Sequence, residues 1–233
     1  MAFLSSIIEI VMPTVSCGHN RVKKRLEGKQ IMLSVRSALF AAILVIWGSS
    51  ATSAHAGSAS EHAAEFQAGL LATMKVAEQL SVADRYKKLE PVIKGSFHLS
   101  LMAGLSAGQH WQTATNDQRE RLVQGFSRMS IATLATLFDG YSGEIFSVTG
   151  ERQGPQDITF VDTVLKSPGR DSDVVISYVA RKFGNEWRLI DVIVDGGISE
   201  LKVRISEYRQ TLNTGGIEAL ITLLNKKADD LLS

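Results

Sequence analysis

Hydrophobic residues recur at helical spacing from residue 57 onward. Phe66, Leu70, Met74 and Ala77 follow one another at intervals of three or four positions, which predicts an amphipathic helix. Ser60 stands before this stripe as a candidate N-terminal cap. The chain after residue 56 is therefore expected to begin with a helix.

Two capping patterns predict further helices. Ser81 with Asp84 three positions later marks one start, and Thr115 with Gln118 marks another. Pro91 is expected to end the first of these segments or to open the next one. That next stripe contains Ile93, Phe97, Leu101 and Leu105. A long helix is expected at 116–139, with the hydrophobic residues Leu122, Val123, Phe126, Met129, Leu134, Leu137 and Phe138.

The pattern changes to strand-like alternation after Gly140. Strands are expected at 144–149, 158–165, 174–183 and 186–194. Gly184-Asn185 fits a two-residue hairpin turn, which would place Lys182 opposite Trp187 and Tyr178 opposite Asp191. One face of this hairpin would carry Val175, Val179, Phe183, Ile190, Val192 and Val194, and the other Val174, Ile176, Tyr178, Trp187, Leu189 and Ile193. Since both faces are apolar, we expect that both are covered or that one lines a cavity.

Two amphipathic helices are predicted to close the chain. The first has Ile198, Leu201, Ile205, Tyr208 and Leu212 on one face, and the second has Ile217, Leu220, Leu224, Ala228 and Leu231. Gly215-Gly216 is expected to separate them. Helices, then about four strands, then helices indicate an α+β fold with an antiparallel sheet.

The N-terminal segment has the pattern of a secretory signal. Residues 32–56 combine Arg36, a short apolar core and the small-residue sequence Ala54-His55-Ala56, so we expect export and cleavage after Ala56. The alternative is an uncleaved N-terminal anchor. Residues 1–31 precede a signal pattern that has its own Met32, and we interpret them as an extra N-terminus from a start assigned too early, Met1 instead of Met32. The remainder, 57–233, is expected to form a single domain.

Composition narrows the function classes. The 233 residues carry a formal net charge of +1, with 45% hydrophobic and 21% charged residues, which is ordinary for a globular protein. A net charge this close to zero argues against nucleic-acid binding through phosphates. The only cysteine is Cys17, so the segment 57–233 has no disulfide available and depends on packing.

Candidate catalytic residues are few. No nucleophile elbow, P-loop, GxGxxG or zinc motif occurs, so we expect no enzyme activity, no cofactor and no metal. His98 and His110 could be a metal pair or ordinary helix polar groups, and His110 or Asp191 could be an acid/base group. The structural alternative for Asp191 is a hydrogen bond to Tyr178 or to the start of a neighbouring helix.

Three arginines on the long predicted helix admit two interpretations. Arg119, Arg121 and Arg128 could clamp a lipid phosphate, or they could form the solvated face of the helix.

Several short segments, in order, resemble one known family. They are Arg85–Ile93 followed by Phe97, Gly108-Gln109-His110-Trp111, Asn116–Arg119, Phe138–Glu144, and Trp187–Val192 with Gly197-Ile198-Ser199. Together they resemble the MlaC and toluene-tolerance family of periplasmic phospholipid-binding proteins. The segment Phe138–Glu144 is closer to the hopanoid-associated HpnM branch.

The resemblance implies a lipid carrier. It implies a curved antiparallel sheet that encloses an apolar cavity with the helices, and a phospholipid or hopanoid as cargo. It also implies exchange with an inner-membrane transport complex and an outer-membrane lipoprotein, in the periplasm. The expected lipid-binding residues are Phe97, Leu101, Leu105, Phe126, Met129, Phe146, Val148, Tyr178, Val192, Val194, Ile205 and Tyr208. The alternative is an exported adaptor of a membrane lipid-transport system that carries no cargo.

Overall fold

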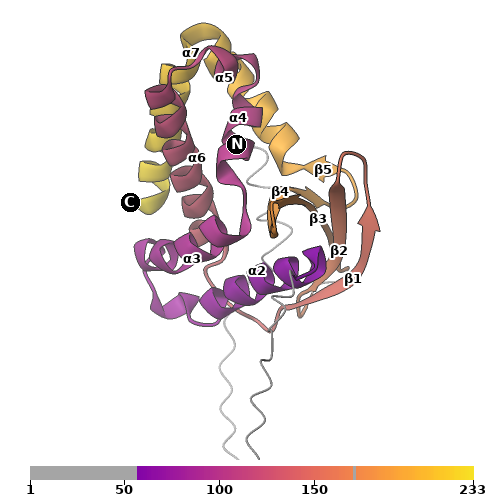
Figure 1. Ribbon diagram of the computed structural model, residues 1–233. Coiled ribbons are helices and arrows are strands. Elements are labelled where there is room, and N and C mark those ends of the chain that lie inside the picture. The colour runs from indigo at the N-terminus through magenta and orange to yellow at the C-terminus, as the bar shows by residue number, and fades with distance from the viewer. Residues whose placement is uncertain (1–56, 170–171) are drawn as a thin grey trace, which may run out of the picture. The chain divides into compact units, whose positions relative to one another are not determined.

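Helices precede and follow one sheet in the computed structural model, which describes residues 57–169 and 172–233 (Figure 1). The helical elements are α2 (Ala59–Met74), η1 (Ala77–Gln79), α3 (Val82–Ser96), α4 (Leu99–Ala107), α5 (Gln109–Thr113), α6 (Asn116–Leu137) and α7 (Glu200–Leu232). The predicted signal at 32–56 and the stretch 1–31 lie outside the described residues, so those interpretations stay predictions. Within the described residues, no helix combines the length and the hydrophobicity that a bilayer span requires.

Side-chain caps fix where most of these helices begin. Ser81 caps α3 and Thr115 caps α6 with a capping box, as the sequence predicts. The cap of α2 is Ser58 instead of Ser60, because Glu61 three positions after Ser58 completes a capping box there. Ser60 lies inside the helix, and its hydroxyl and backbone N–H donate to the Glu151 carboxylate of the sheet.

The segment around Pro91 differs from its prediction. Pro91 neither ends nor begins a helix but lies within α3, which continues to Ser96. The break comes at Phe97, whose backbone is extended, and α4 begins two residues later at Leu99 with His98 as its cap. The chain therefore resets its helical phase between the stripe of α3 and that of α4.

The sheet has five antiparallel strands in sequence order. They are β1 (Ile145–Gln153), β2 (Ile158–Lys166), β3 (Val174–Phe183), β4 (Glu186–Val194) and the short β5 (Ile198–Ser199). The α+β prediction is confirmed, with β5 added as a two-residue strand that pairs with the end of β4. Sequential antiparallel pairing follows from the short connections between the strands.

A β-bulge changes the predicted register of the β3–β4 hairpin. Lys182 lies opposite Trp187, as predicted from the Gly184-Asn185 turn, but the register shifts beyond Ala180. Tyr178 therefore pairs with Val192 and not with Asp191. Because one extra residue exchanges the faces of a strand, Val192 and Val194 move to the face of Tyr178, and the predicted assignment of the two faces is wrong beyond the bulge.

Gly216 interrupts the last helix. Its φ of 64° and ψ of −159° are not helical, so residues 200–215 and 217–232 are two straight parts of α7 that meet at a kink. The prediction of two C-terminal helices with a break at Gly215-Gly216 thus matches the backbone. A glycine is suited to this position because a side chain there would be strained.

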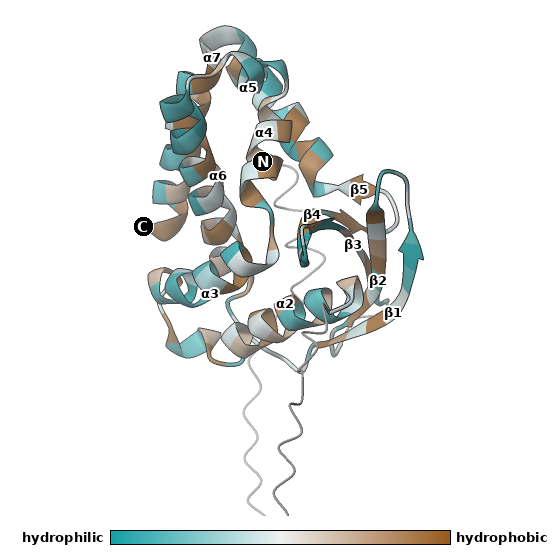
Figure 2. Ribbon diagram, viewed as in Figure 1, coloured by the Kyte–Doolittle hydropathy of each residue, from teal (hydrophilic) through white to brown (hydrophobic). Residues whose placement is uncertain are grey.

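The helices form a layer beside the sheet. Figure 1 shows α6 running next to the second part of α7, with the sheet across the molecule and α2 crossing one end. The main contacts of α6 are with α7, α3 and α4, whereas α2 contacts β1, β2, β3 and β4. Teal and brown residues alternate along α6 and α7 in Figure 2, as expected of helices with one buried face. Helix α6 therefore packs mainly against other helices and not directly against the sheet.

Candidate functional site

A cavity of about 420 Å³ lies between α6, α7 and the sheet. It is far larger than the roughly 10–15 Å³ that a single buried water molecule occupies, and it falls within the range of roughly 300–1,000 Å³ typical of ligand pockets. Residues of every main helix except α5, and of four strands, contribute to its wall. The cavity exists because α6 packs against other helices instead of closing onto the sheet.

The wall of the cavity is predominantly apolar. Its hydrophobic lining residues are Phe66, Leu70, Ile93, Phe97, Leu99, Met102, Phe126, Met129, Leu134, Leu137, Phe138, Phe146, Leu165, Ile176, Val192, Val194, Leu201 and Leu231. Such a wall offers dispersion contacts but almost no hydrogen bonds, so it favours an alkyl or ring system over a polar metabolite.

An aromatic group forms one part of this wall. The Phe66 ring packs edge-to-face on Phe97 at 5.0 Å and on Tyr178 at 5.8 Å between ring centroids. The amide of buried Gln67 donates a hydrogen bond of 3.4 Å to the Tyr178 hydroxyl, and burial raises the pKa of Tyr178 to about 12. Tyr178 is therefore neutral at physiological pH and acts as a wall residue.

The charged lining residues all lie on α7. Glu200, Arg204 and Glu207 come from its first part, and Lys227 and Asp230 from its second. The Arg204 side chain is 20% exposed and that of Asp230 is 61% exposed. The two parts of α7 thus border the cavity where it meets solvent, and we call these five residues the charged rim.

Among the residues of the charged rim, Glu200 has the most strongly shifted pKa. Its Oε1 atom is buried and has no hydrogen-bond partner within the described residues. Burial raises the pKa of Glu200 to about 7, and the carboxylates of Asp191 and Glu207 add to this, while the Arg204 guanidinium opposes it. Near neutral pH the Glu200 carboxyl therefore exchanges between its acid form and its anion.

Arg204 keeps donors available. Its Nη1 lies 3.6 Å from Glu207 Oε2 and 3.8 Å from Met129 Sδ. Neither distance is that of a charge-assisted hydrogen bond, which is about 2.7–2.9 Å. Among the described residues, its guanidinium makes no such bond to a carboxylate, so N–H groups remain free at the edge of an apolar cavity.

Asp191 sets the position of the charged rim. Its Oδ1 accepts hydrogen bonds from the backbone N–H groups of Val192 and Leu201, at 2.8 and 2.9 Å. Its Oδ2 accepts from the hydroxyl of Ser199, the cap of α7, whose Oγ in turn accepts from Lys202 N. Of the alternatives for Asp191, the helix-start interpretation matches the structure, and a bond to Tyr178 does not. The spacing between Asp191 and Ser199 therefore allows the carboxylate on β4 to hold the residue that caps α7.

Seven of the predicted lipid-binding residues meet at the cavity. They are Phe97, Phe126, Met129, Phe146, Tyr178, Val192 and Val194. Their role in lipid binding stays a prediction, but the structure brings them from five different segments of the chain to one wall.

Five predicted residues lie elsewhere. Leu101 and Leu105 miss the cavity because α4 begins anew at Leu99, which turns Leu99 and Met102 inward and leaves Leu105 45% exposed. Val148 is 38% exposed on the edge strand β1, beside a register shift.

The other two misplaced residues are Ile205 and Tyr208 on α7. Tyr208 is fully buried, and neither residue belongs to the cavity lining. The apolar stripe of this part of the helix was expected to line the cavity. Instead the adjacent face with Glu200, Arg204 and Glu207 does so, together with Leu201.

Sequence reasoning missed the charged rim entirely. It searched for apolar lining residues only. A signal was available: Glu200, Arg204 and Glu207 are spaced by four and three, which places them on one helix face. The second group, Lys227 and Asp230, could not be joined to the first because the sequence predicts the break at Gly216 but not how the two parts of α7 are oriented there.

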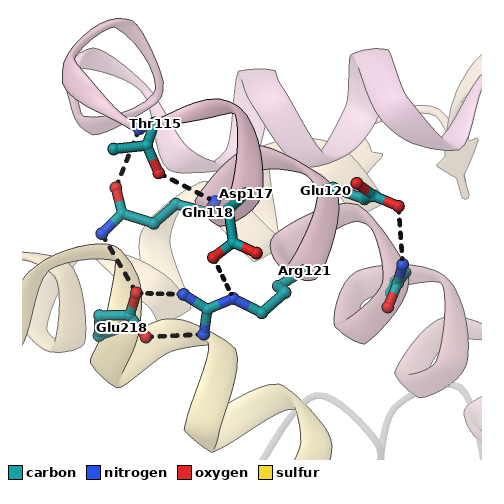
Figure 3. A network of polar contacts seen from close by, with 7 residues as sticks. Thr115, Asp117, Gln118, Glu120, Arg121 and Glu218 are labelled. Carbon is teal, nitrogen blue, oxygen red and sulfur yellow. Dashed lines mark hydrogen bonds and ion pairs between the residues drawn. The ribbon is translucent and has the colours of Figure 1, made fainter.

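The three arginines of the proposed phosphate clamp have partners in the protein. Arg121 binds Glu218 through two hydrogen bonds and Asp117 through one, in the network of Figure 3. Arg119 donates to the carbonyl groups of Trp111 and Gln112, and Arg128 lies 2.6 Å from Asp229. None of the three lines the cavity. They tie α6 to α7 and to α5 and do not form a clamp.

The histidines also lie outside the cavity lining. His98 caps α4 by accepting from Leu101 N, and His110 is on α5 with its Nε2 buried and unpartnered among the described residues. Within residues 57–169 and 172–233, no three His, Cys, Asp or Glu side chains gather in a way that could hold a metal ion.

Comparisons with known proteins agree with this geometry. A family model described as MlaC protein matches residues 65–226. Among solved structures, the chain is similar to a phospholipid-binding protein from Ralstonia solanacearum that was solved in complex with a phospholipid. The identity is 18%, the match covers 76% of this chain and 100% of that one, and the TM-score is 0.67, which shows a shared fold. No curated protein matches the chain.

Proposed function

The chain belongs to the MlaC protein family, and on that premise we propose that it binds a membrane lipid and carries it across the periplasm. The observation that supports this most directly is the apolar cavity of about 420 Å³ with a charged rim. Its solved structural relative holds a phospholipid. A binding protein, and not an enzyme, is the function class that fits both observations.

The physical requirement for such a carrier is concealment of hydrocarbon. Each methylene group exposed to water costs about 0.8 kcal/mol, so an acyl chain cannot cross an aqueous compartment unprotected. Phe66, Phe126 and Met129 offer a preformed apolar wall whose own burial does not depend on the lipid, since each is at most 4% exposed. The charged rim leaves the polar part of the lipid in contact with water.

The finer parts of the proposal rest on the sequence. The signal at 32–56 supports a periplasmic location, and the segment Phe138–Glu144 supports the HpnM branch and a hopanoid as an alternative cargo. Shuttling between an inner-membrane complex and an outer-membrane lipoprotein is the role that a soluble carrier of this kind would serve. Within the segment Phe138–Glu144, it is Phe138 that lines the cavity.

The first test is the content of the purified protein. We expect mass spectrometry of an organic extract to find a phospholipid or a hopanoid in stoichiometric amount, and the mass distinguishes the two. Protein that is lipid-free after mild purification, and that takes up no lipid from vesicles, would contradict the proposal and favour the adaptor alternative.

The second test fills the cavity. Met129 lies in the lining with its sulfur near Thr133 and Arg204, so Met129→Trp is expected to occupy cavity space and lower the lipid-to-protein ratio several-fold. The matched control is Leu105→Trp, an identical aromatic at a helix position outside the lining. Equal loading of both variants would remove Met129 from the binding site.

A further inference from the structure

The charged rim has a composition that bears on the head group of the cargo. It contains three carboxylates, Glu200, Glu207 and Asp230, and two cations, Arg204 and Lys227. Asp230 is already paired with Lys226 at 2.7 Å, so two carboxylates, Glu200 and Glu207, remain with the two cations Arg204 and Lys227. A head group that carries only negative charge would be attracted by the cations but would leave these two carboxylates without a positive partner.

The phosphate has one well-placed partner. The Arg204 guanidinium faces the cavity with N–H groups that no carboxylate of the described residues satisfies at hydrogen-bond distance. Arg121 and Arg152 differ in this respect, since they donate to carboxylates at 2.5–2.9 Å and at 2.8–3.3 Å. A guanidinium in this state is suited to a phosphate, which it can bind through two parallel hydrogen bonds.

The carboxylates require a hydrogen-bond donor. Glu200 Oε1 is buried without a partner among the described residues, and such an oxygen loses the hydration that it would have in water. A primary ammonium group has three N–H donors, whereas a quaternary trimethylammonium group has none. The side chains of Glu200 and Glu207 flank Arg204 on the same helix, so a phosphate at Arg204 would place a neighbouring ammonium within their reach.

From this arrangement we infer that Arg204, Glu200 and Glu207 form a head-group site for a zwitterionic phospholipid with a primary ammonium, a phosphoethanolamine. Arg204 binds the phosphate, and Glu200 with Glu207 accepts hydrogen bonds from the ammonium. This inference rests on the proposed function, because it concerns the same cavity. It adds a class of head group that the apolar wall by itself does not select.

The test is a competition between head groups that share their acyl chains. The delipidated protein is mixed with vesicles of equal parts phosphatidylethanolamine, phosphatidylcholine and phosphatidylglycerol, separated, extracted and analysed by mass spectrometry. We expect the bound ethanolamine lipid to exceed the choline lipid by about tenfold, the ratio that one charge-assisted hydrogen bond can produce. Glu200→Gln is expected to lower this ratio severalfold.

Controls separate this inference from a general effect of charge. Glu218→Gln changes another α7 carboxylate, which is exposed, outside the lining and bound to Arg121, and the ratio should stay that of the unchanged protein. Glu207→Gln, at an exposed position, gives a second measurement should Glu200→Gln fail to fold.

The possible results distinguish the head-group site from the lipid carrier. Lipid uptake in proportion to vesicle composition, a preference for phosphatidylglycerol, or an unchanged ratio in both Glu200→Gln and Glu207→Gln would overturn the head-group site while leaving the lipid carrier intact. Uptake of no lipid from these vesicles, nor from vesicles that also contain a hopanoid, would overturn the proposed function itself. An ethanolamine preference that falls in the variants supports both.

Discussion

Replacing Glu200 by glutamine tests the electrostatics of the charged rim without any ligand. Glutamine keeps the size of glutamate but cannot ionise, so the substitution removes one titration and little packing. The Glu200 carboxyl is partly buried, with Oε1 lacking a hydrogen-bond partner in the described residues, near the carboxylates of Asp191 and Glu207 and the guanidinium of Arg204. Its ionisation is thus expected to oppose folding.

The size and sign of the effect follow from the pKa of Glu200. Burial raises it from an ordinary value of 4.5 to about 7. Between these values the folded protein retains a proton that the unfolded chain has released, so the free energy of unfolding falls as pH rises through this window and levels off above it. One pKa unit corresponds to about 1.4 kcal/mol, so the total loss attributable to Glu200 is about 3 kcal/mol.

The measurement is the difference in unfolding free energy between Glu200→Gln and the unchanged protein. Urea unfolding of delipidated protein, followed by the fluorescence of Trp111 and Trp187, gives this difference at each pH from about 4 to 8. Other titrating groups cancel in the difference. We expect the variant to gain about 3 kcal/mol relative to the unchanged protein across the window, and any constant offset reflects lost contacts only.

A flat difference curve would refute this account, because it would mean that the Glu200 carboxyl is solvated in the folded protein. Glu218→Gln is the control of opposite sign. Hydrogen bonds from Arg121 and Gln118 lower the pKa of Glu218, so its charge stabilises the folded state at neutral pH, and this contribution is lost on acidification.

Three substitutions test how the elements are held together, with urea unfolding as the measurement for each. Asp191→Ala removes an acceptor of three hydrogen bonds, two of them from Ser199 and Leu201 at the start of α7, and is expected to cost about 2–4 kcal/mol. A change below about 1 kcal/mol would contradict its helix-start role. Arg85→Met leaves the carbonyl groups of Ala135 and Leu80 without the guanidinium and is expected to cost about 2–3 kcal/mol, whereas an unchanged midpoint would show that water replaces it. Gly216→Ala places a side chain at φ 64° and is expected to cost about 1–3 kcal/mol. Gly215→Ala is unsuitable as a control because its Cβ would meet Ala219. An unchanged unfolding free energy in Gly216→Ala would show that the kink relaxes.

Local signals in the sequence specified most of the elements. The Thr115–Gln118 capping box predicted the start of α6, and Gly184-Asn185 predicted the β3–β4 turn with Lys182 opposite Trp187. These predictions held because caps and two-residue turns are decided by residues a few positions apart. One exception is Pro91, which lies inside α3, where the packing of α3 against α6 and α2 outweighs the local tendency of proline to break a helix.

The candidate site was only half predictable. Phe126, Met129 and Phe146 were identified because large apolar residues on inward faces must line whatever lies between the layers. Leu105 and Tyr208 were misplaced because their helices are rotated by events that periodicity does not register, the new start at Leu99 and the orientation of α7. The β-bulge in β4 likewise moved Val192 to the cavity face without any signal in the alternation.

By itself the sequence determined most of the helices and strands and the α+β class, since these depend on short-range patterns of polar and apolar residues and on caps and turns, and its resemblance to known segments indicated the family. Only the tertiary structure decided that the apolar residues leave a space between α6 and the sheet, because a filled core and a lined cavity are built from the same residue types and differ only in how far apart the elements are held. It also decided that Glu200, Arg204 and Glu207 border this space together with Lys227 and Asp230, since the kink at Gly216 brings the two parts of α7 to one rim.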